Sequence, residues 1–259
     1  MTGGKALEVQ GLARAFGGFR AVDGVSFAVA PGEVVALIGP NGAGKTTTFN
    51  LVNGQLKPDR GRVLVAGREV TGEGPRRLWE MGVARTFQIT ATFATMSVRE
   101  NLAVAVMAAR RQPRHLFSLR RMPALDAPET SQLIADAGLG AIADRICATL
   151  AYGDLKRVEL AVALANAPRL LLMDEPTAGM AGAERGALME LAVGAARARG
   201  AAILFTEHDM GVVFRHAERV LVMSRGKLIA EGPPDEIRAN AQVREVYLGH
   251  VGAAPRGRS

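Results

Sequence analysis

The sequence predicts an α/β fold with a mostly parallel core sheet, an antiparallel β part at its edge and an inserted group of helices. Short apolar runs typical of buried strands, such as 34–38, 169–173 and 201–206, alternate with longer stretches whose apolar residues recur at helical spacing. A stretch with only helical patterns, 89–150, separates the two halves of this alternation. Alternating strands and helices imply parallel strands with right-handed crossovers.

Residues 1–88 are expected to hold mainly strands. Glycine-containing turns at Gly17-Gly18 and Asp23-Gly24 join two antiparallel edge strands, and Pro75 opens a short helix. The expected elements are strands at 7–16, 25–29, 34–38, 62–67 and 83–87, with helices at 47–53 and 75–80.

Residues 89–150 are expected to form an all-helical insert. Ser97, with Glu100 three residues later, is a capping box that opens a helix. Prolines interrupt the chain after this helix, and helical spacing then resumes. The expected helices lie at 97–110, 129–137 and 142–148. An insert of about 60 residues is large enough to form a small subdomain.

Strands and helices alternate again over residues 151–259. A glycine turn at Arg225-Gly226 predicts a hairpin near the end. The expected elements are helices at 154–166, 183–199 and 209–216, strands at 169–173 and 201–206, hairpin strands at 220–224 and 227–231, and two short helices that end at Leu248.

Length and composition narrow the class of protein. A chain of 259 residues with 48% hydrophobic residues can build one large α/β domain, or a core with an inserted subdomain. No apolar stretch reaches the ~18 residues that a membrane-spanning helix needs, and the first five residues lack the apolar segment of a secretion signal. The single cysteine, Cys147, cannot form an internal disulfide, which fits a reducing compartment, and we expect it to be a small buried side chain.

The formal charge of +7 is unevenly distributed. No acidic residue lies between Glu100 and Asp126, and the tail ends in Arg256-Gly257-Arg258-Ser259. The arginines of this acid-free stretch are Arg110, Arg111, Arg114, Arg120 and Arg121. A solvated loop or a patch beside anionic lipid headgroups fits such a cluster. No nucleic acid partner is expected, because no aromatic interleaving or nucleic-acid-binding motif accompanies the charge.

A glycine-rich loop at residues 39–46, Gly-Pro-Asn-Gly-Ala-Gly-Lys-Thr, carries the strongest functional signal. It matches the pattern GxxxxGK[ST] and lies between an apolar strand and a helix, which is the context in which this pattern binds phosphate. Glycines let the backbone N–H groups approach an anion, and the helix N-terminus points its positive dipole at the same place. Lys45 is then placed to reach the β- and γ-phosphates and Thr46 to hold Mg²⁺. The sequence therefore predicts a nucleoside triphosphate site.

Two carboxylates, Asp174 and Glu175, end the apolar run that begins at Leu170. Ligands of open α/β sheets lie at the carboxyl ends of the strands, so these acids are expected at the same edge as the glycine-rich loop. Asp174 suits a Mg²⁺-facing acid, and Glu175 is placed to accept a proton from an attacking water.

Together these motifs resemble the ATP-binding subunits of ABC transporters over nearly the whole chain. Residues 39–46 match the Walker A motif of that family, and 170–175 match Walker B with its adjacent glutamate. The other matches are Phe16 at the adenine-stacking position, Gln88 as the Q-loop glutamine, His208 as the switch histidine, and 150–154, Leu-Ala-Tyr-Gly-Asp, at the place of the signature Leu-Ser-Gly-Gly-Gln.

The resemblance implies a P-loop NTPase fold of the ABC ATPase type, with one ABC ATPase domain over 1–259. Its RecA-like catalytic core comprises 1–88, including the antiparallel part, and 151–259, and its helical subdomain is 89–150. The implied catalytic residues are Lys45, Gln88, Glu175 and His208. The implied ATP contacts are Phe16, Gly39, Pro40, Asn41, Gly42, Ala43, Gly44, Lys45, Thr46 and Thr47. The implied Mg²⁺ ligands are Thr46, Gln88 and Asp174.

Within this family two subunits pack head to tail, and ATP lies between the phosphate loop of one and the signature of the other. Ala151, Tyr152, Gly153 and Asp154 would make the contact in trans. The implied partners are a second ATPase subunit, identical or not, two transmembrane permease subunits and, indirectly, a periplasmic solute-binding protein. The implied location is peripheral, on the cytoplasmic face of the inner membrane. The helical insert, with the stretch around 90–96, is where a permease helix is expected to dock.

Three positions depart from the family pattern. Ala151 replaces the signature serine, Asp154 replaces the signature glutamine, and Ala181 stands where an aspartate follows Walker B. These changes bear on the strength and symmetry of the closed dimer. They leave Lys45 and Glu175 in place, so hydrolysis of ATP to ADP and phosphate is still expected.

Phe16-Gly17-Gly18, Leu150 to Gly153 and the ending Glu245 to Gly249 resemble importers of branched-chain amino acids, in the amino-acid and urea uptake group. Import of branched-chain amino acids is therefore the expected function. A related importer of urea, amides or another solute, and an ABC ATPase that does not act in transport, remain alternatives. A switch that binds nucleotide without hydrolysing it is favoured only by the altered signature.

Overall fold

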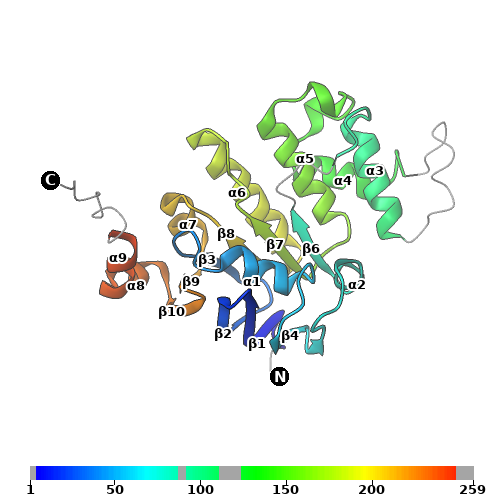
Figure 1. The fold of residues 1–259 in the computed structure, drawn as a ribbon. Coiled ribbons are helices and arrows are strands. Elements are labelled where there is room, and N and C mark those ends of the chain that lie inside the picture. Colours follow the sequence, from blue (N-terminus) through cyan, green and yellow to red (C-terminus); the bar gives the residue numbers. More distant parts are fainter. Residues whose placement is uncertain (1–3, 87–91, 111–123, 249–259) are drawn as a thin grey trace.

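A six-stranded, mostly parallel sheet forms the centre of the molecule in the computed structural model, which describes residues 4–86, 92–110 and 124–248 (Figure 1). The strand order is β10-β9-β3-β8-β7-β6, and only the β10–β9 pair is antiparallel. The strands are β3 (Val34–Ile38), β6 (Val83–Thr86), β7 (Leu170–Asp174), β8 (Ala202–Thr206), β9 (Arg219–Ser224) and β10 (Lys227–Gly232). The carboxyl ends of β3, β7 and β8 thus meet at one edge of the sheet.

Each central strand is apolar on both faces because the sheet separates two cores. Val35 and Leu37 of β3 pack in the core beneath the N-terminal strands and the first helix, whereas Val34, Ala36 and Ile38 pack against the helices on the opposite face. This alternation follows from the two-residue period of a strand. A near-continuous apolar run is what a parallel strand covered on both faces requires.

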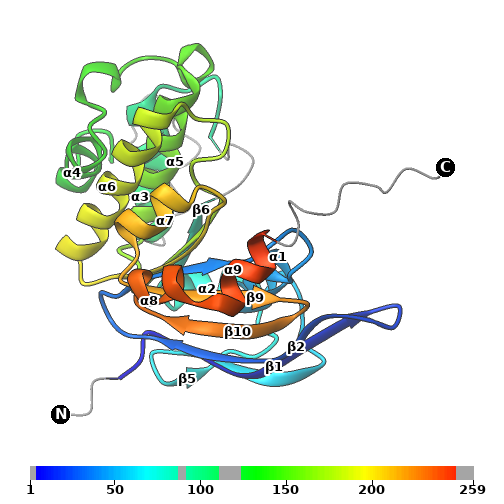
Figure 2. The same ribbon diagram turned by 90° about the vertical axis from the view of Figure 1, so that its left-hand side faces the viewer.

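A four-stranded antiparallel sheet, β2-β1-β4-β5, covers one face of the central sheet (Figure 2). Its strands are β1 (Leu7–Phe16), β2 (Phe19–Val29), β4 (Arg60–Val65) and β5 (Arg68–Glu69). The expected antiparallel edge is confirmed, but β2 begins at Phe19 and not at Val25. The two-residue turn Gly17-Gly18, with φ of 51° and 88°, closes the hairpin directly, so pairing resumes at Phe19.

The helices lie on both faces of the central sheet. The first, α1 (Lys45–Val52), follows β3 and packs on the side of the antiparallel sheet, while α5 to α7 cover the other face (Figures 1 and 2). The remaining helices of the described residues are α2 (Pro75–Glu80), α3 (Val98–Ala109), α4 (Pro128–Asp136), α5 (Tyr152–Leu164), α6 (Gly182–Ala198), α7 (Met210–His216), α8 (Pro234–Ala239) and α9 (Ala241–Leu248). The capping box that opens α3 is formed as expected, with Ser97 and Glu100 bonding each other's backbone N–H.

The expected helix over 142–148 is wrong. Two single 3₁₀ turns, Gly140–Ile142 and Cys147–Thr149, occupy this stretch. Between them Ile146 forms an isolated antiparallel bridge with Ser97, and the N–H of Val98 bonds the carbonyl of Arg145. These contacts with the start of α3 extend the backbone and override the helical spacing of the sequence.

The single cysteine is buried, as expected. Cys147 is 1% exposed, and its Sγ accepts a hydrogen bond from the side-chain amide of Asn101 at 3.3 Å. Burial raises the pKa of the Cys147 thiol above its ordinary value. A neutral, protonated thiol packs here as a small apolar group.

No helix in the described ranges combines the length and the apolar character that crossing a membrane requires.

His216, the last residue of α7, gives the fold a predictable response to acid. Burial, helped by the charge of Arg215 and opposed by that of Glu190, lowers the pKa of His216 below its ordinary value of 6.5, and its Nε2 is buried without a partner among the described residues. Because the pKa of His216 is lower in the folded than in the unfolded chain, its contribution to the free energy of unfolding is fully present above pH 6.5. Below pH 6.5 it falls until the folded pKa is reached, since the unfolded chain binds a proton that the folded chain does not.

We therefore expect His216→Gln to lose less stability than the parent when the pH is lowered from 7.5 to 5.5. Urea unfolding midpoints at the two pH values measure this. An equal loss in both proteins would show that His216 is not the titrating group.

Candidate nucleotide site

The glycine-rich loop has the backbone geometry that a phosphate loop needs. It connects β3 to α1, and Gly44 is the residue before the helix, with φ of 101°. A Cβ at Gly44 would lie 2.2 Å from the carbonyl oxygen of Ala21, and one at Gly39 would lie 2.3 Å from that of Met223. Glycine is therefore required at both positions by close approach of neighbouring backbone as well as by positive φ.

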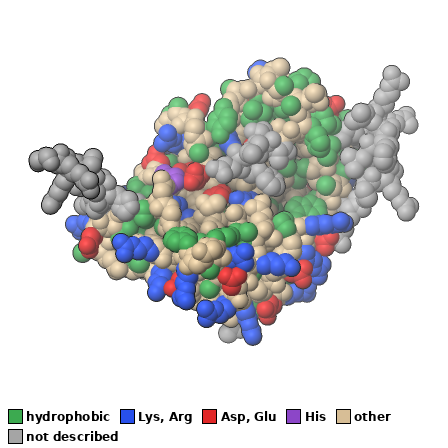
Figure 3. Space-filling view, viewed as in Figure 1, with side chains coloured by type: hydrophobic (Ala, Val, Ile, Leu, Met, Phe, Trp, Pro, Cys, Tyr) green, Lys and Arg blue, Asp and Glu red, His purple; other side chains and the backbone are tan. Residues whose placement is uncertain are grey.

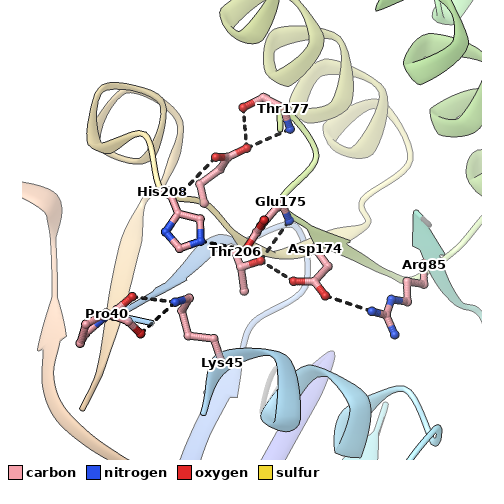
Figure 4. A network of polar contacts seen from close by, with 10 residues as sticks. Pro40, Lys45, Arg85, Asp174, Glu175, Thr177, Thr206 and His208 are labelled. Carbon is pink, nitrogen blue, oxygen red and sulfur yellow. Dashed lines mark hydrogen bonds and ion pairs between the residues drawn. The ribbon is translucent and has the colours of Figure 1, made fainter. Parts of the chain in front are cut away.

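Lys45 is buried, 7% exposed, and its ammonium lies within the loop. Nζ donates to the carbonyl oxygens of Gly39 at 2.6 Å and Pro40 at 3.2 Å (Figure 4). Burial lowers the pKa of Lys45 below its ordinary value, and the negative charges of Glu175 and Asp174 act in the opposite direction. A buried cation bonded only to neutral carbonyls among the described residues is the chemistry expected of a site built for an anion.

A pocket of about 210 Å³ opens beside this loop. Thr46 is exposed in it and Thr47 half-buried. Besides residues of the loop, Glu175 and His208 line this pocket. The lining residues are Phe19, Ala21, Asn41, Gly42, Ala43, Gly44, Lys45, Thr46, Thr47, Glu175 and His208.

Glu175 and His208 lie in direct contact at the rim of this pocket. Oε1 of Glu175 is 2.8 Å from Nε2 of His208 (Figure 4). Glu175 has φ of 48°, in the left-handed region that a non-glycine residue seldom adopts. Its N–H bonds the hydroxyl and the carbonyl of Thr206 at 3.0 and 3.1 Å, which holds this strained turn in place. Strain of this kind often marks a functional position.

Asp174 is held by both of its carboxylate oxygens. Oδ1 accepts from the Thr206 hydroxyl at 2.6 Å, and Oδ2 is 3.0 Å from a guanidinium nitrogen of Arg85. Sequence reasoning missed both partners. Thr206 could have been suspected, because it ends the strand that follows the strand of Asp174 along the chain.

The donor atoms near the loop fit a hard cation. The hydroxyl of Thr46 and the carboxylate of Asp174 are oxygen ligands of the kind that Mg²⁺ prefers, and Mg²⁺ is commonly held by few protein ligands together with substrate phosphates and water. Within the described ranges no group of three or more His, Cys, Asp or Glu side chains could hold a metal by itself. Gln88, the third expected ligand, lies outside the described residues.

The comparison with protein-family models identifies the family. A model described as ABC transporter matches residues 22–178, which include the phosphate loop and both acids. The chain belongs to the ABC transporter family. A second model, described as branched-chain amino acid ATP-binding cassette transporter, matches residues 227–253.

Relatives and solved structures are similar to this ABC cassette along nearly its full length. It is 37% identical over 256 residues to the high-affinity branched-chain amino acid transport ATP-binding protein BraF of Pseudomonas aeruginosa, covering 95% of this chain and 98% of that one. It is 39% identical over 252 residues to LivG of Escherichia coli, described in the same words, with the same coverage. Among solved structures, the ADP conformation of an ATP-binding cassette is 32% identical with a TM-score of 0.83, covering 95% of this chain and 99% of that one. A nucleotide-free cassette is 31% identical with a TM-score of 0.80, covering 94% and 98%.

The expected fold and enzyme class are thus confirmed. The chain has the fold of ABC ATPases, uses ATP and is the ATP-hydrolysing, ATP-binding component of a transport system, which implies permease partners in the membrane.

The residues expected to form the signature, 151–154, lie at the start of α5 in this ABC cassette. Ala151 is the N-cap and Tyr152 the first helical residue, so the helix begins two residues before the expected Asp154. The Tyr152 hydroxyl donates to the carbonyl of Ala178 at 3.1 Å. Oδ1 of Asp154 lies 3.8 Å from Nη1 of Arg157. The residues that line the pocket beside the glycine-rich loop do not include any of 151–154. The signature contact with ATP in trans therefore stays a prediction.

Phe19 lines the pocket beside the glycine-rich loop, whereas Phe16, expected to stack on adenine, does not. Phe16 is 44% exposed and packs under the guanidinium of Arg14, 5.0 Å from the ring centre. The two rings are cross-strand partners in the β1–β2 hairpin, beside the turn. Phe19 is thus a second aromatic candidate for adenine, which sequence reasoning missed because β2 was expected to begin later.

Glu207 is a further residue that the sequence did not single out. This buried carboxylate accepts from the N–H and hydroxyl of Thr177 at 2.9 and 2.6 Å and from the N–H of His208 at 3.1 Å (Figure 4). It joins the segment after Asp174-Glu175 to the backbone of His208.

Proposed function

We propose that this ABC ATPase energises the import of branched-chain amino acids, with Mg²⁺ as cofactor. In this proposal it lies on the cytoplasmic face of the inner membrane, beside two permease subunits and a second ATPase subunit, and a periplasmic protein delivers the solute. The contact between Glu175 and His208 at the rim of the Lys45 pocket carries the proposal of catalysis. The relatives described as branched-chain amino acid transport proteins support the cargo.

Each residue of the site has its own role in the proposed hydrolysis. Lys45, once its loop carbonyls give way to a phosphate, supplies a fixed positive charge for the β- and γ-phosphates. Glu175 orients an attacking water and accepts its proton, and His208 holds the Glu175 carboxylate and meets the γ-phosphate. Thr46, Asp174 and Gln88 would hold Mg²⁺. When bound, the ion neutralises charge on the phosphate oxygens.

A second subunit would complete the site. The four residues 151–154 lie at the N-terminus of α5. The free N–H groups of this helix suit a phosphate of the ATP that a facing subunit holds in its glycine-rich loop. Ala151 supplies no side-chain cap and no hydroxyl there, and Ala181 likewise leaves the N-terminus of α6 without a side-chain cap. We infer that this subunit's own signature contributes a weaker trans contact than the family pattern provides. ATP drives closure only to the extent that it binds the closed dimer more tightly than the open one.

The proposal is tested with the complex reconstituted in liposomes with its permease subunits and solute-binding protein. We expect Mg-ATP hydrolysis that rises severalfold when leucine, isoleucine or valine is added with the binding protein. Stimulation by urea or an amide alone would assign a different cargo. Absence of phosphate release from the assembled complex would contradict the proposed catalysis.

A further inference from the structure

Arg85 connects two parts of the nucleotide site that are far apart in sequence. It lies on β6, the neighbour of β7, with Arg85 in register with Leu172. Because side chains alternate along a strand, Arg85, Leu172 and Asp174 project on the same face, toward α1. The side chain of Arg85 is 14% exposed and that of Asp174 is 4% exposed, so their contact is largely shielded from water.

The guanidinium makes three bonds, one to the end of β7, one to α1 and one to the turn that follows α1. Nη2 is 3.0 Å from Oδ2 of Asp174 (Figure 4), and Nη1 donates to Oδ1 of Asn50 at 2.9 Å and to Oε1 of Gln55 at 2.8 Å. Asn50 lies in α1, four residues after Thr46, and therefore on the same side of that helix. Arg85 thus links the helix that carries Thr46 to the strand that carries Asp174.

We propose that Arg85 is a positioning residue for Mg²⁺, holding Asp174 and α1 at the separation at which Asp174 and Thr46 can share one ion. This inference rests on the proposed use of Mg-ATP. The planar, forked guanidinium can bond the carboxylate and both amide oxygens at once, whereas an ammonium is a point charge that cannot span them.

The test measures how ATP binding depends on Mg²⁺ in a Glu175→Gln background, where turnover does not consume the nucleotide. A fluorescent ATP analogue is titrated in EDTA and at increasing Mg²⁺. We expect Arg85→Lys to raise the Mg²⁺ concentration for half-maximal binding about tenfold or more, as removal of partners that orient metal ligands commonly does, with binding in EDTA unchanged. Arg77→Gln, a charge change on the exposed face of α2, should leave both values as in the parent.

Asn50→Ala keeps the bonds of Arg85 to Asp174 and Gln55 and removes only the direct bond to α1, so it should raise the Mg²⁺ requirement less than Arg85→Lys. If Arg85→Lys fails to fold, this second variant decides the question. A Mg²⁺ requirement within twofold of the parent in whichever variant is folded, or an equal loss of binding in EDTA, would overturn the positioning role. Failure of the parent itself to bind the analogue with Mg²⁺ would instead contradict the proposed function.

Discussion

Glu175→Gln should lower the rate of ATP hydrolysis by about a hundredfold to ten-thousandfold, because a positioned general base contributes a factor of this size. The amide has nearly the shape of the carboxylate but cannot accept the proton of the attacking water. ATP binding should be retained, since the Lys45 ammonium and the loop backbone are unchanged. Phosphate release from the assembled complex and retention of labelled ATP measure the two effects separately.

The matched control is Glu73→Gln, the same chemical change at an exposed acid that does not line the pocket. It should hydrolyse ATP at the parental rate. If Glu175→Gln kept more than about a tenth of the parental rate, Glu175 would not be the general base. The contact with His208 would then have to be explained as support for the strained turn at Glu175.

The phosphate loop and the order of strands and helices could be predicted because their signals are local. An apolar run, a glycine-rich turn and a helix without a breaker stand next to one another in the sequence, and β3, the loop and α1 follow in that order. The stretch 142–148 could not be predicted in the same way. Its backbone is decided by pairing with Ser97, which lies far away in sequence, and a helical spacing carries no trace of that contact.

The site shows the same division between local and distant information. Asp174 and Glu175 could be placed at the sheet edge because a strand visibly ends there. That Arg85 would meet Asp174 depends on β6 lying next to β7, a sheet order that a single sequence does not contain. The boundaries of the helical subdomain and the roles of the site residues stay predictions.

Gly44→Ala should weaken both the fold and nucleotide binding. The new Cβ would lie 2.2 Å from the carbonyl oxygen of Ala21 in β2, at a φ of 101° that alanine seldom adopts. The backbone of β2 or of the loop must move, and overpacking together with left-handed strain should lower the free energy of unfolding by about 3 kcal/mol. Displaced N–H groups at the start of α1 should reduce ATP affinity by about tenfold or more, since one lost bond to a charged group has that effect.

The control is Gly67→Ala, in the β4–β5 turn. Gly67 also has positive φ, 76°, but nothing lies within 4 Å of its Cβ position. The free energy of unfolding of this variant should fall by only about 1 kcal/mol, the cost of the left-handed conformation alone. The variant should bind ATP as the parent does. Urea unfolding and nucleotide titration on the two variants separate the cost of the left-handed backbone conformation from the cost of the steric clash with Ala21. Equal losses at both positions would mean that the close approach of β2 to the loop is not what requires glycine at position 44.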